Sequence, residues 1–315
     1  MDVDLDLTRI EEAARTADPV FRDSPQFVSE QLCAALGRTV LVKIETANPV
    51  GSFKGRGAGF LVRSLPSGST VVCASSGNFG VALAYAARER GMGVHVYVSP
   101  GINPARLARM RNLGAEVTVD DGNPGQAARA HAAAHPGCVL ANNHPAVAEG
   151  AGTIGVELLR AGHLDTVVLP VSDGSLITGA GRWIKARSPA TRIIGVCPAA
   201  APAVAQSWRA GRVVRAEPAA TIADSLAIRE PAPEAVRRMR AVVDDMILVS
   251  DSALLDGMRL AARTLGVLVE PSAAAGLAAI ACHDLPGATL ATVLTGTDPG
   301  SPLLAEALRD RGTRT

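Results

Sequence analysis

The sequence predicts an α/β protein with two open, twisted and mainly parallel sheets flanked by helices. The first observation is an alternation of short valine-rich apolar runs with longer runs of helical periodicity, which begins at residue 70. The second is that a similar alternation resumes at residue 154 and continues towards the end of the chain. Strands that alternate with helices form parallel βαβ units, because a parallel strand needs a crossover connection to reach its neighbour.

The first block has clear boundaries, because glycine or serine follows the apolar runs and glycine follows the helical ones. We expect strands at TVVCAS (70–75), GVHVYVS (93–99), AEVTV (115–119) and CVL (138–140), and helices at VALAYAARER (81–90), PARLARMRNLG (104–114) and GQAARAHAAAH (125–135).

The second block repeats the pattern around a less regular middle, residues 199–225. We expect strands at TVVLPV (166–171), RIIGVC (192–197), MILVS (246–250), VLVEP (267–271) and ATVLTG (291–296), and helices at IGVELLRAG (154–162), SLITGAGRWIKAR (175–187), SALLDGMRLAARTLG (252–266), AAAGLAAIA (273–281) and from about Pro302.

Composition excludes several classes of protein. A net charge of +1 and 3% aromatic residues supply neither a basic surface nor stacking rings, so we expect no nucleic-acid binding. The acidic N-terminus lacks the order of a signal peptide, and Thr8 and Glu11 instead have capping-box spacing. The longest apolar run, 273–282, is far shorter than the ~18 residues of a spanning helix, so we expect a cytoplasmic protein that does not enter the membrane. The five cysteines show no CxxC pairing, which predicts neither a zinc knuckle nor a disulfide framework.

Some short motifs have simple structural explanations. Residues 150–155, GAGTIG, match GxGxxG, but no strand precedes them, so we interpret them as a helix-entry loop. The patterns GxxxxGK[ST], HExxH and GxSxG are absent, which removes the commonest nucleotide-hydrolase, metalloprotease and serine-hydrolase classes. His131 and His135 are spaced i, i+4 without a third ligand nearby, so we expect a solvated helix face rather than a metal site.

The stretch NPVGSFKGRG, residues 48–57, places one lysine among glycines in a chain that has three lysines. The patterns around Lys43 and Lys185 predict surface positions. Lys54 differs, because the glycines around it remove side-chain bulk and let the backbone approach a ligand closely. A lysine in a confined, desolvated setting can lose its proton and act as a nucleophile. The alternative is an exposed lysine in a glycine-rich turn.

Three further segments place small polar residues where a strand ends. ASSGNFG (74–80) offers hydroxyls, N–H groups and an amide that suit a carboxylate or phenolic oxygen, or a simple N-cap. VSDGSLITGAG (171–181) offers an anion cradle suited to a phosphate, and we expect the Asp173 side chain to point away from it. VLTGTDPG (293–300) carries Thr295 and Thr297, either of which could address a ring nitrogen unless the segment is an ordinary turn.

Together and in this order, the four segments resemble the fold-type II pyridoxal-phosphate enzymes, specifically the threonine/serine dehydratase and serine racemase group. The resemblance covers most of the chain, through KIETANPVGSFKGRGA, SSGNFGVALAYAARERG, GAGTIGVELL, TIADSLAI, VSDSALLDGMRLAARTLGVLVEPSAAAGLAA and VLTGT. It implies a large cofactor-binding domain of residues 1–69 and 147–315, a smaller inserted domain of residues 70–146, and a homodimer.

The resemblance also assigns roles to individual residues. Lys54 would form the Schiff base with pyridoxal 5'-phosphate and act in catalysis together with Ser76. The other cofactor contacts would be Phe53 beside the ring, Asn78 at the phenolic oxygen, Gly174, Ser175 and Leu176 at the phosphate with Ser172 and Asp173 in the same loop, Glu270 near the cofactor, and Thr295 at the pyridine nitrogen with Thr297 as the alternative. The substrate carboxylate would contact Ser75, Ser76 and Gly77, with Asn78 and Phe79 in the same pocket.

The implied reaction is β-elimination of a hydroxy amino acid such as L-serine or L-threonine, which yields a 2-oxo acid and ammonia. The substrate amine would displace Lys54, and the freed lysine would remove the α-proton while the cofactor accepts the electrons. A threonine opposite the pyridine nitrogen, in place of a carboxylate, should leave that nitrogen unprotonated, which favours prompt loss of a β-substituent.

The chain departs from the family pattern in several places. SDGS replaces the usual run of glycines in the phosphate loop, Phe79 stands where histidine is common, and Ser225 replaces a glycine. Cys197, Ala201 and Ala203 stand at or near the acidic metal ligands of the serine racemases, so we expect no metal there. The chain ends soon after the last expected helix, so we expect no feedback inhibition through a C-terminal regulatory domain.

Alternatives to elimination stay open. Ser76 matches the serine with which serine racemases protonate the opposite face of the carbanion, so an amino-acid racemase is the first alternative. A β-replacement synthase is the second, suggested by Phe79 and SDGS. A cofactor-binding protein that has lost catalysis is the third.

Overall fold

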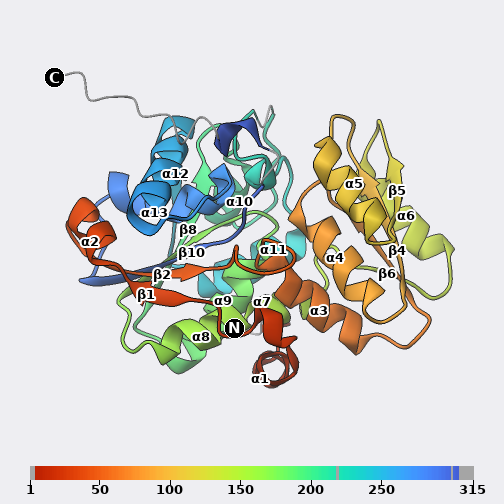
Figure 1. Cartoon of the computed structure of the whole chain (residues 1–315), viewed down its shortest axis with the longest axis horizontal. Coiled ribbons are helices and arrows are strands. Elements are labelled where there is room, and N and C mark those ends of the chain that lie inside the picture. Colours follow the sequence, from red (N-terminus) through yellow and green to blue (C-terminus); the bar gives the residue numbers. More distant parts are fainter. Residues whose placement is uncertain (1–3, 218–219, 299–300, 305–315) are drawn as a thin grey trace.

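The computed structural model describes residues 4–217, 220–298 and 301–304. The strands of these residues form two sheets, which Figure 1 shows side by side. One has six strands in the order β1-β2-β10-β7-β8-β9, and the other has four in the order β5-β4-β3-β6. Among the described strands, the β1–β2 pair is antiparallel and the remaining pairs are parallel. The predicted α/β class with mainly parallel sheets is confirmed.

The six-stranded sheet is covered by helices on both faces. Its strands are β1 (Gln26–Val28), β2 (Thr39–Ile44), β7 (Thr166–Pro170), β8 (Arg192–Pro198), β9 (Asp245–Val249) and β10 (Thr289–Leu294). One core cluster joins this sheet to α2 (Glu30–Leu36), α12 (Asp251–Leu265) and α13 (Ala275–Cys282). A second joins it to α8 (Thr153–Arg160), α9 (Ser175–Arg187), α10 (Ala203–Ala210) and α11 (Pro233–Val242). Central strands such as β7 are buried along their whole length for this reason.

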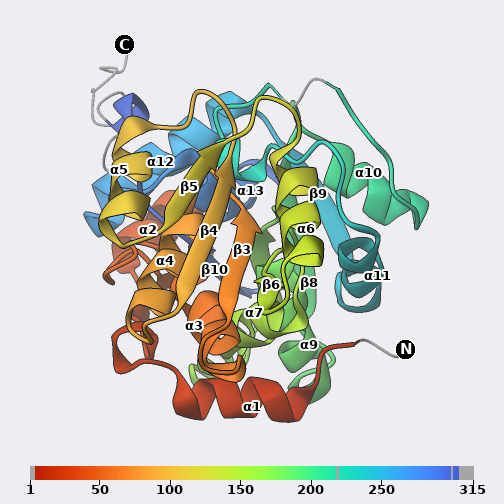
Figure 2. The ribbon, with the colours of Figure 1, turned by 90° about the vertical axis from the view of Figure 1, so that its right-hand side faces the viewer.

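The four-stranded sheet lies between α3 (Lys54–Ser64) and α7 (Pro145–Ala151) in the chain. Its strands are β3 (Thr70–Ala74), β4 (Gly93–Val98), β5 (Glu116–Val119) and β6 (Cys138–Leu140), and its helices are α4 (Asn78–Arg88), α5 (Pro104–Asn112) and α6 (Pro124–Ala134). Figure 2 looks onto this part of the molecule, with α1 (Leu7–Thr16) crossing below it. The domain boundaries at 69/70 and 146/147 stay predictions.

Two local predictions are wrong. The expected strand at 267–271 does not form. The Glu270 N–H makes one hydrogen bond to the Gly296 carbonyl, and the next residue, Pro271, has no N–H and begins the short 3-10 helix η3 (Pro271–Ala274). The N-cap of α1 is Asp6, whose carboxylate accepts from the Thr8 N–H and hydroxyl at 2.8 Å, so Thr8 is not the cap. The final predicted helix lies mostly outside the described residues.

The glycines of GAGTIG permit close packing between helices. A Cβ on Gly150 would lie 2.7 Å from the carbonyl oxygen of Arg56, and one on Gly155 would lie 2.7 Å from that of Ala180. The motif joins α7 to α8 with Gly152 between them, rather than following a strand. It therefore seats α3 and α9, which both reach the site described below. None of the helices in the described ranges has the length and hydropathy to cross a membrane.

Candidate active site

A pocket of about 440 Å³ lies between the two sheets, where the ends of strands meet the N-termini of helices. This is the expected location of a ligand in parallel α/β folds, and the volume suits a small molecule. The pocket is lined by every predicted site residue except Ser175, namely Phe53, Lys54, Ser75, Ser76, Gly77, Asn78, Phe79, Ser172, Asp173, Gly174, Leu176, Glu270 and Thr295. Thr297 is not among the lining residues, so Thr295 is the threonine that faces the pocket.

Lys54 is the first residue of α3 and extends into the pocket with 13% of its side chain exposed. Its Nζ lies 4.9 Å from the centre of the Phe53 ring and 5.5 Å from that of Phe79. Two aromatic rings therefore shield the amine from water. The prediction of an exposed turn lysine does not hold, and the prediction of a confined lysine does.

Asp173 points at Lys54, so the expectation that its side chain turns away from the loop is wrong. Its Oδ2 lies 2.9 Å from Lys54 Nζ, and the Ser175 hydroxyl lies 3.3 Å from the same nitrogen. Burial opposes ionisation, but the Lys54 charge and hydrogen bonds from Ser175 outweigh it and hold the pKa of Asp173 below its ordinary value. The attraction between opposite charges explains the orientation.

The glycines beside Lys54 serve packing more than ligand approach. A Cβ on Gly55 would lie 2.2 Å from the Phe21 ring, and one on Gly57 would lie 2.4 Å from the Val147 carbonyl oxygen. Gly51 has a φ of +72°, which a side chain rarely adopts. None of the three lines the pocket. They matter because they let α3 pack closely enough to bring Lys54 into position.

The segment 75–78 forms the N-terminal end of α4, as predicted. Ser75 Oγ accepts from the Gly77 N–H at 3.2 Å, and Ser76 Oγ accepts from the Ser99 N–H at 3.0 Å. The first N–H groups of a helix have no partner inside it, so this end can bind an anionic group such as a carboxylate.

Glu270 connects this end of α4 to a partly buried cluster of charges. Its Oε2 accepts from Asn78 Nδ2 at 3.3 Å and from Arg106 at 3.2 Å, and Arg106 also pairs with Asp224 at 2.9 Å and Asp298 at 3.1 Å. Burial, together with the carboxylates of Asp224 and Asp298, raises the pKa of Glu270 to about 7 against the opposing effect of Arg106. Asn78, the predicted contact of the phenolic oxygen, is thus held by a group that titrates near neutral pH.

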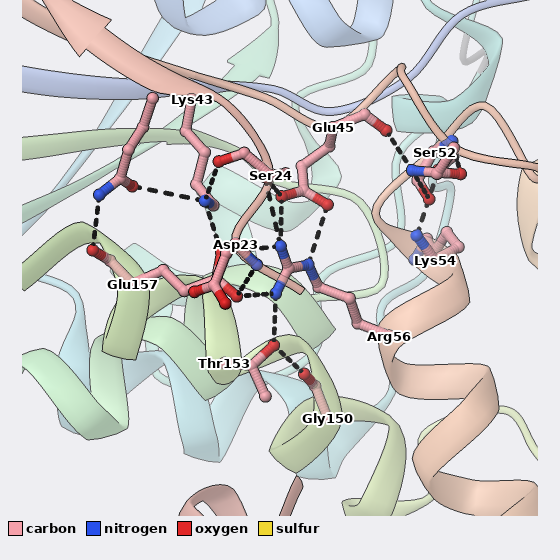
Figure 3. Close-up of polar contacts among 12 residues, drawn as sticks. Asp23, Ser24, Lys43, Glu45, Ser52, Lys54, Arg56, Gly150, Thr153 and Glu157 are labelled. Carbon is pink, nitrogen blue, oxygen red and sulfur yellow. Dashed lines mark hydrogen bonds and ion pairs between the residues drawn. The ribbon is translucent and has the colours of Figure 1, made fainter. Parts of the chain in front are cut away.

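A second ionic network lies behind Lys54 and was not predicted. Figure 3 shows the Arg56 guanidinium between two carboxylates, Glu45 at 2.8 Å and Glu157 at 2.7 Å. Glu157 also pairs with Lys43 at 2.5 Å. The prediction that Lys43 is a surface residue is wrong: its side chain has no exposed area, because β2 is covered on both faces. Lys185 is partly exposed and pairs with Asp244 at 2.7 Å.

The network ties three elements together near the predicted reactive lysine. Arg56 lies on α3 two residues after Lys54, Glu45 directly follows β2, and Glu157 lies on α8. Four buried charges of balanced sign therefore hold the first turn of α3 against β2 and α8.

Sequence reasoning missed several pocket residues. Tyr97 and Ser99 lie at the end of β4, Asn142 follows β6, and Ser272 lies in η3. For Tyr97, Ser99 and Asn142 the signal was their place at or just after the carboxyl end of a strand, where parallel sheets place ligands, whereas Ser272 follows no strand. The Asn142 side chain bonds both the N–H and the carbonyl of Ala74, which fixes the loop that follows β3.

The predicted solvated face at His131 is wrong, while His135 is exposed as expected. His131 is half-buried, and its Nδ1 lies 2.9 Å from the hydroxyl of Tyr97. Within the residues that the structure describes, no group of three or more His, Cys, Asp or Glu side chains could hold a metal ion.

The pocket fits the cofactor that the resemblance implies. It offers an amine at Lys54, a hydroxyl at Thr295 and the N-terminus of α9 for an anion. The Ser272 hydroxyl is buried, lines the pocket and has no hydrogen-bond partner in the described part of the chain, which leaves it free for a ligand.

Known proteins with similar sequences or structures agree with this fit. Residues 18–296 match the family described as "Pyridoxal-phosphate dependent enzyme". Serine racemase from Oryza sativa subsp. indica is 31% identical over 283 residues, which cover 87% of this chain and 83% of that protein. L-threonine ammonia-lyase from Thermotoga maritima is 31% identical over 300 residues, 92% of this chain and 75% of that protein. The crystal structure of a threonine deaminase from T.th. superposes with a TM-score of 0.86 at 34% identity and covers 93% of this chain and 98% of that one.

Proposed function

Because the chain belongs to the pyridoxal-phosphate-dependent enzyme family, we propose that it deaminates a hydroxy amino acid such as L-serine or L-threonine to a 2-oxo acid and ammonia. The single observation that carries the proposal is a shielded lysine amine, Lys54, in one pocket with a neutral hydroxyl at Thr295. The similarity to a threonine ammonia-lyase over 92% of the chain supports the same reaction class.

The residues of the pocket can divide the work of this reaction. When bound, pyridoxal phosphate supplies an electron sink for the pair released when the substrate loses its α-proton. Lys54 Nζ accepts that proton, and the rings of Phe53 and Phe79 keep water away from the amine. Ser75, Ser76 and the end of α4 bind the substrate carboxylate and so orient the α-carbon.

A hydroxyl at Thr295 suits elimination better than a carboxylate would. A carboxylate at a pyridine nitrogen stabilises its protonated form, which strengthens electron withdrawal, whereas a neutral hydroxyl does so less. A moderate electron sink favours expulsion of a β-hydroxyl over long-lived charge on the cofactor. Thr295 lines the pocket and is 5% exposed, so its side chain is held in place by the surrounding protein.

Racemisation is the second candidate, supported by Ser76 and by the similarity to a rice serine racemase. The Ser76 oxygen accepts from the Ser99 N–H, which leaves its own proton available to a substrate. Chiral analysis of the amino acid recovered after incubation separates the two reactions, because a Ser76→Ala protein would lose far more of its racemisation than of its elimination. A thiol added to the same incubation would reveal β-replacement as a new thioether.

The test of the main proposal is direct. The purified protein with pyridoxal phosphate is incubated with L-serine and L-threonine, and 2-oxo acid and ammonia are measured together. We expect both products in equal amounts from the wild type and none from Lys54→Ala. A wild-type protein that binds the cofactor and forms neither product from either amino acid contradicts the proposal.

We also propose a homodimer, from the resemblance alone, and a location in the cytoplasm, from the shortness of the apolar runs. Light scattering on the purified protein would test the dimer, because a measured mass near that of one 32.3 kDa chain would contradict it.

A further inference from the structure

The phosphate loop of this chain contains an anion of its own. The Asp173 carboxylate lies at the N-terminus of α9, where its Oδ1 accepts from the Ser175 N–H at 2.9 Å and from the Ser175 hydroxyl at 2.7 Å. Its Oδ2 pairs with Lys54 Nζ at 2.9 Å. One carboxylate therefore takes both a helix N–H group and the amine of the pocket.

A cofactor phosphate needs the first of these two groups, the N–H at the start of α9. The first N–H groups of a helix have no partner inside it and carry the positive end of the helix dipole, so they are the anion site of this loop. The Ser175 N–H is the first of these in α9, and Gly174 beside it lines the pocket. As long as Asp173 accepts from Ser175, a phosphate cannot take that hydrogen bond, and two anions cannot share the site without repulsion.

We propose that Asp173 is a built-in anion that competes with the phosphate of pyridoxal phosphate for the N-terminus of α9. The chain then binds its cofactor more weakly than the same pocket with an uncharged residue at this position. The inference rests on the family assignment and on geometry, and does not depend on which reaction the protein catalyses.

When a phosphate binds, the Asp173 side chain moves and the loop backbone stays in place. Gly174 has a φ of +87°, and a Cβ there would already contact Met239 and Ala235 at 3.5 and 3.6 Å, so the backbone lies against α11. Ser172, on the other side, donates its hydroxyl to the carbonyl of Ser225. The Asp173 side chain itself is 33% exposed, so it borders solvent. A bound phosphate would therefore displace the carboxylate and leave the loop in place.

The test compares cofactor affinities of the full chain after removal of its cofactor, without any measurement of turnover. Pyridoxal phosphate and pyridoxal, which lacks the phosphate, are titrated against the wild type, Asp173→Asn and Asp173→Gly, with the visible absorbance of the bound ligand as the signal. A charge-assisted hydrogen bond contributes roughly 1.5–3 kcal/mol, so we expect about tenfold or more tighter binding of pyridoxal phosphate by both variants. Pyridoxal should gain less than about a third of that factor.

The matched control is Asp244→Asn, which removes a carboxylate that pairs with another lysine, Lys185, at 2.7 Å and does not line the pocket. We expect its affinity for pyridoxal phosphate to stay within about twofold of the wild type. Unchanged or weaker binding by both Asp173 variants overturns the proposal. So does an equal gain for pyridoxal, or an equal gain in the Asp244 control, because either result would reflect general charge rather than competition at α9.

Inorganic phosphate provides a second readout that needs no cofactor. In Asp173→Gly the N-terminus of α9 is free, so we expect inorganic phosphate to raise the thermal midpoint of this variant by several degrees and that of the wild type by less. An equal rise in the two proteins would contradict the competition.

Discussion

The buried network behind Lys54 predicts a large loss of stability when one charge is removed. Glu157 accepts from Arg56 at 2.7 and 2.9 Å, from Lys43 at 2.5 Å and from the Asp23 N–H at 3.0 Å. With Glu45 these form two positive and two negative side chains. In Glu157→Gln, Glu45 alone would balance Lys43 and Arg56, so one buried positive charge would be unpaired.

The expected cost is about 3–5 kcal/mol in the free energy of unfolding, the range for removing one partner of a buried ion pair. Lys43 and Arg56 have no exposed side-chain area, so water cannot replace the lost carboxylate without a change in packing. Urea unfolding followed by circular dichroism measures the loss, provided that the slope with denaturant is the same in both proteins.

A double-mutant cycle separates charge balance from packing. Lys43→Met leaves one excess negative charge and should cost a similar amount, whereas Glu157→Gln combined with Lys43→Met restores neutrality with Arg56 and Glu45. We therefore expect the double variant to lose at least about 2 kcal/mol less than the sum of the single losses. A single loss below about 1 kcal/mol, or additive losses, would refute the argument from charge.

Three further outcomes follow from the structure. Lys54→Ala should show no visible absorbance of lysine-linked cofactor, and retention of that absorbance would exclude Lys54 as the anchor. The folded-state pKa of Glu270 is raised from 4.5 to about 7, so its contribution to the free energy of unfolding is fully present below about pH 4.5 and is lost as pH rises through 7. The loss amounts to about 3 kcal/mol. Urea unfolding at several pH values should show this loss in the wild type and not in Glu270→Gln. Gly57→Ala should destabilise the protein by about 1–3 kcal/mol, because its Cβ would lie 2.4 Å from the Val147 carbonyl oxygen. A Cβ on Gly59, in the same helix, meets nothing within 4 Å, so Gly59→Ala should be neutral or stabilising. Equal effects of the two substitutions would contradict the packing argument.

The local sequence patterns determined the secondary structure and the place of the site. The run SLITGAGRWIKAR, residues 175–187, coincides with α9, because helical periodicity between a glycine and a serine is a local signal. The segment 75–80 and Thr295 each follow the carboxyl end of a strand, where parallel sheets place ligands, but β3 and β10 belong to different sheets, so only the family resemblance assigned both to one pocket. A strand at 267–271 was a false prediction because an apolar run does not specify whether a partner strand lies beside it.

The sequence by itself determined the alternation of strands and helices, which depends on periodicity. Its short motifs, through the family resemblance, indicated many of the residues that gather in the pocket. Only the tertiary structure decided the environment of individual charges. Lys43 has the pattern of an exposed strand residue, yet it is buried because α8 brings Glu157 over β2. Asp173 turns towards the pocket because Lys54, distant in the chain, lies 2.9 Å away. The energy of a charge depends on what lies across from it in space, which no local pattern records.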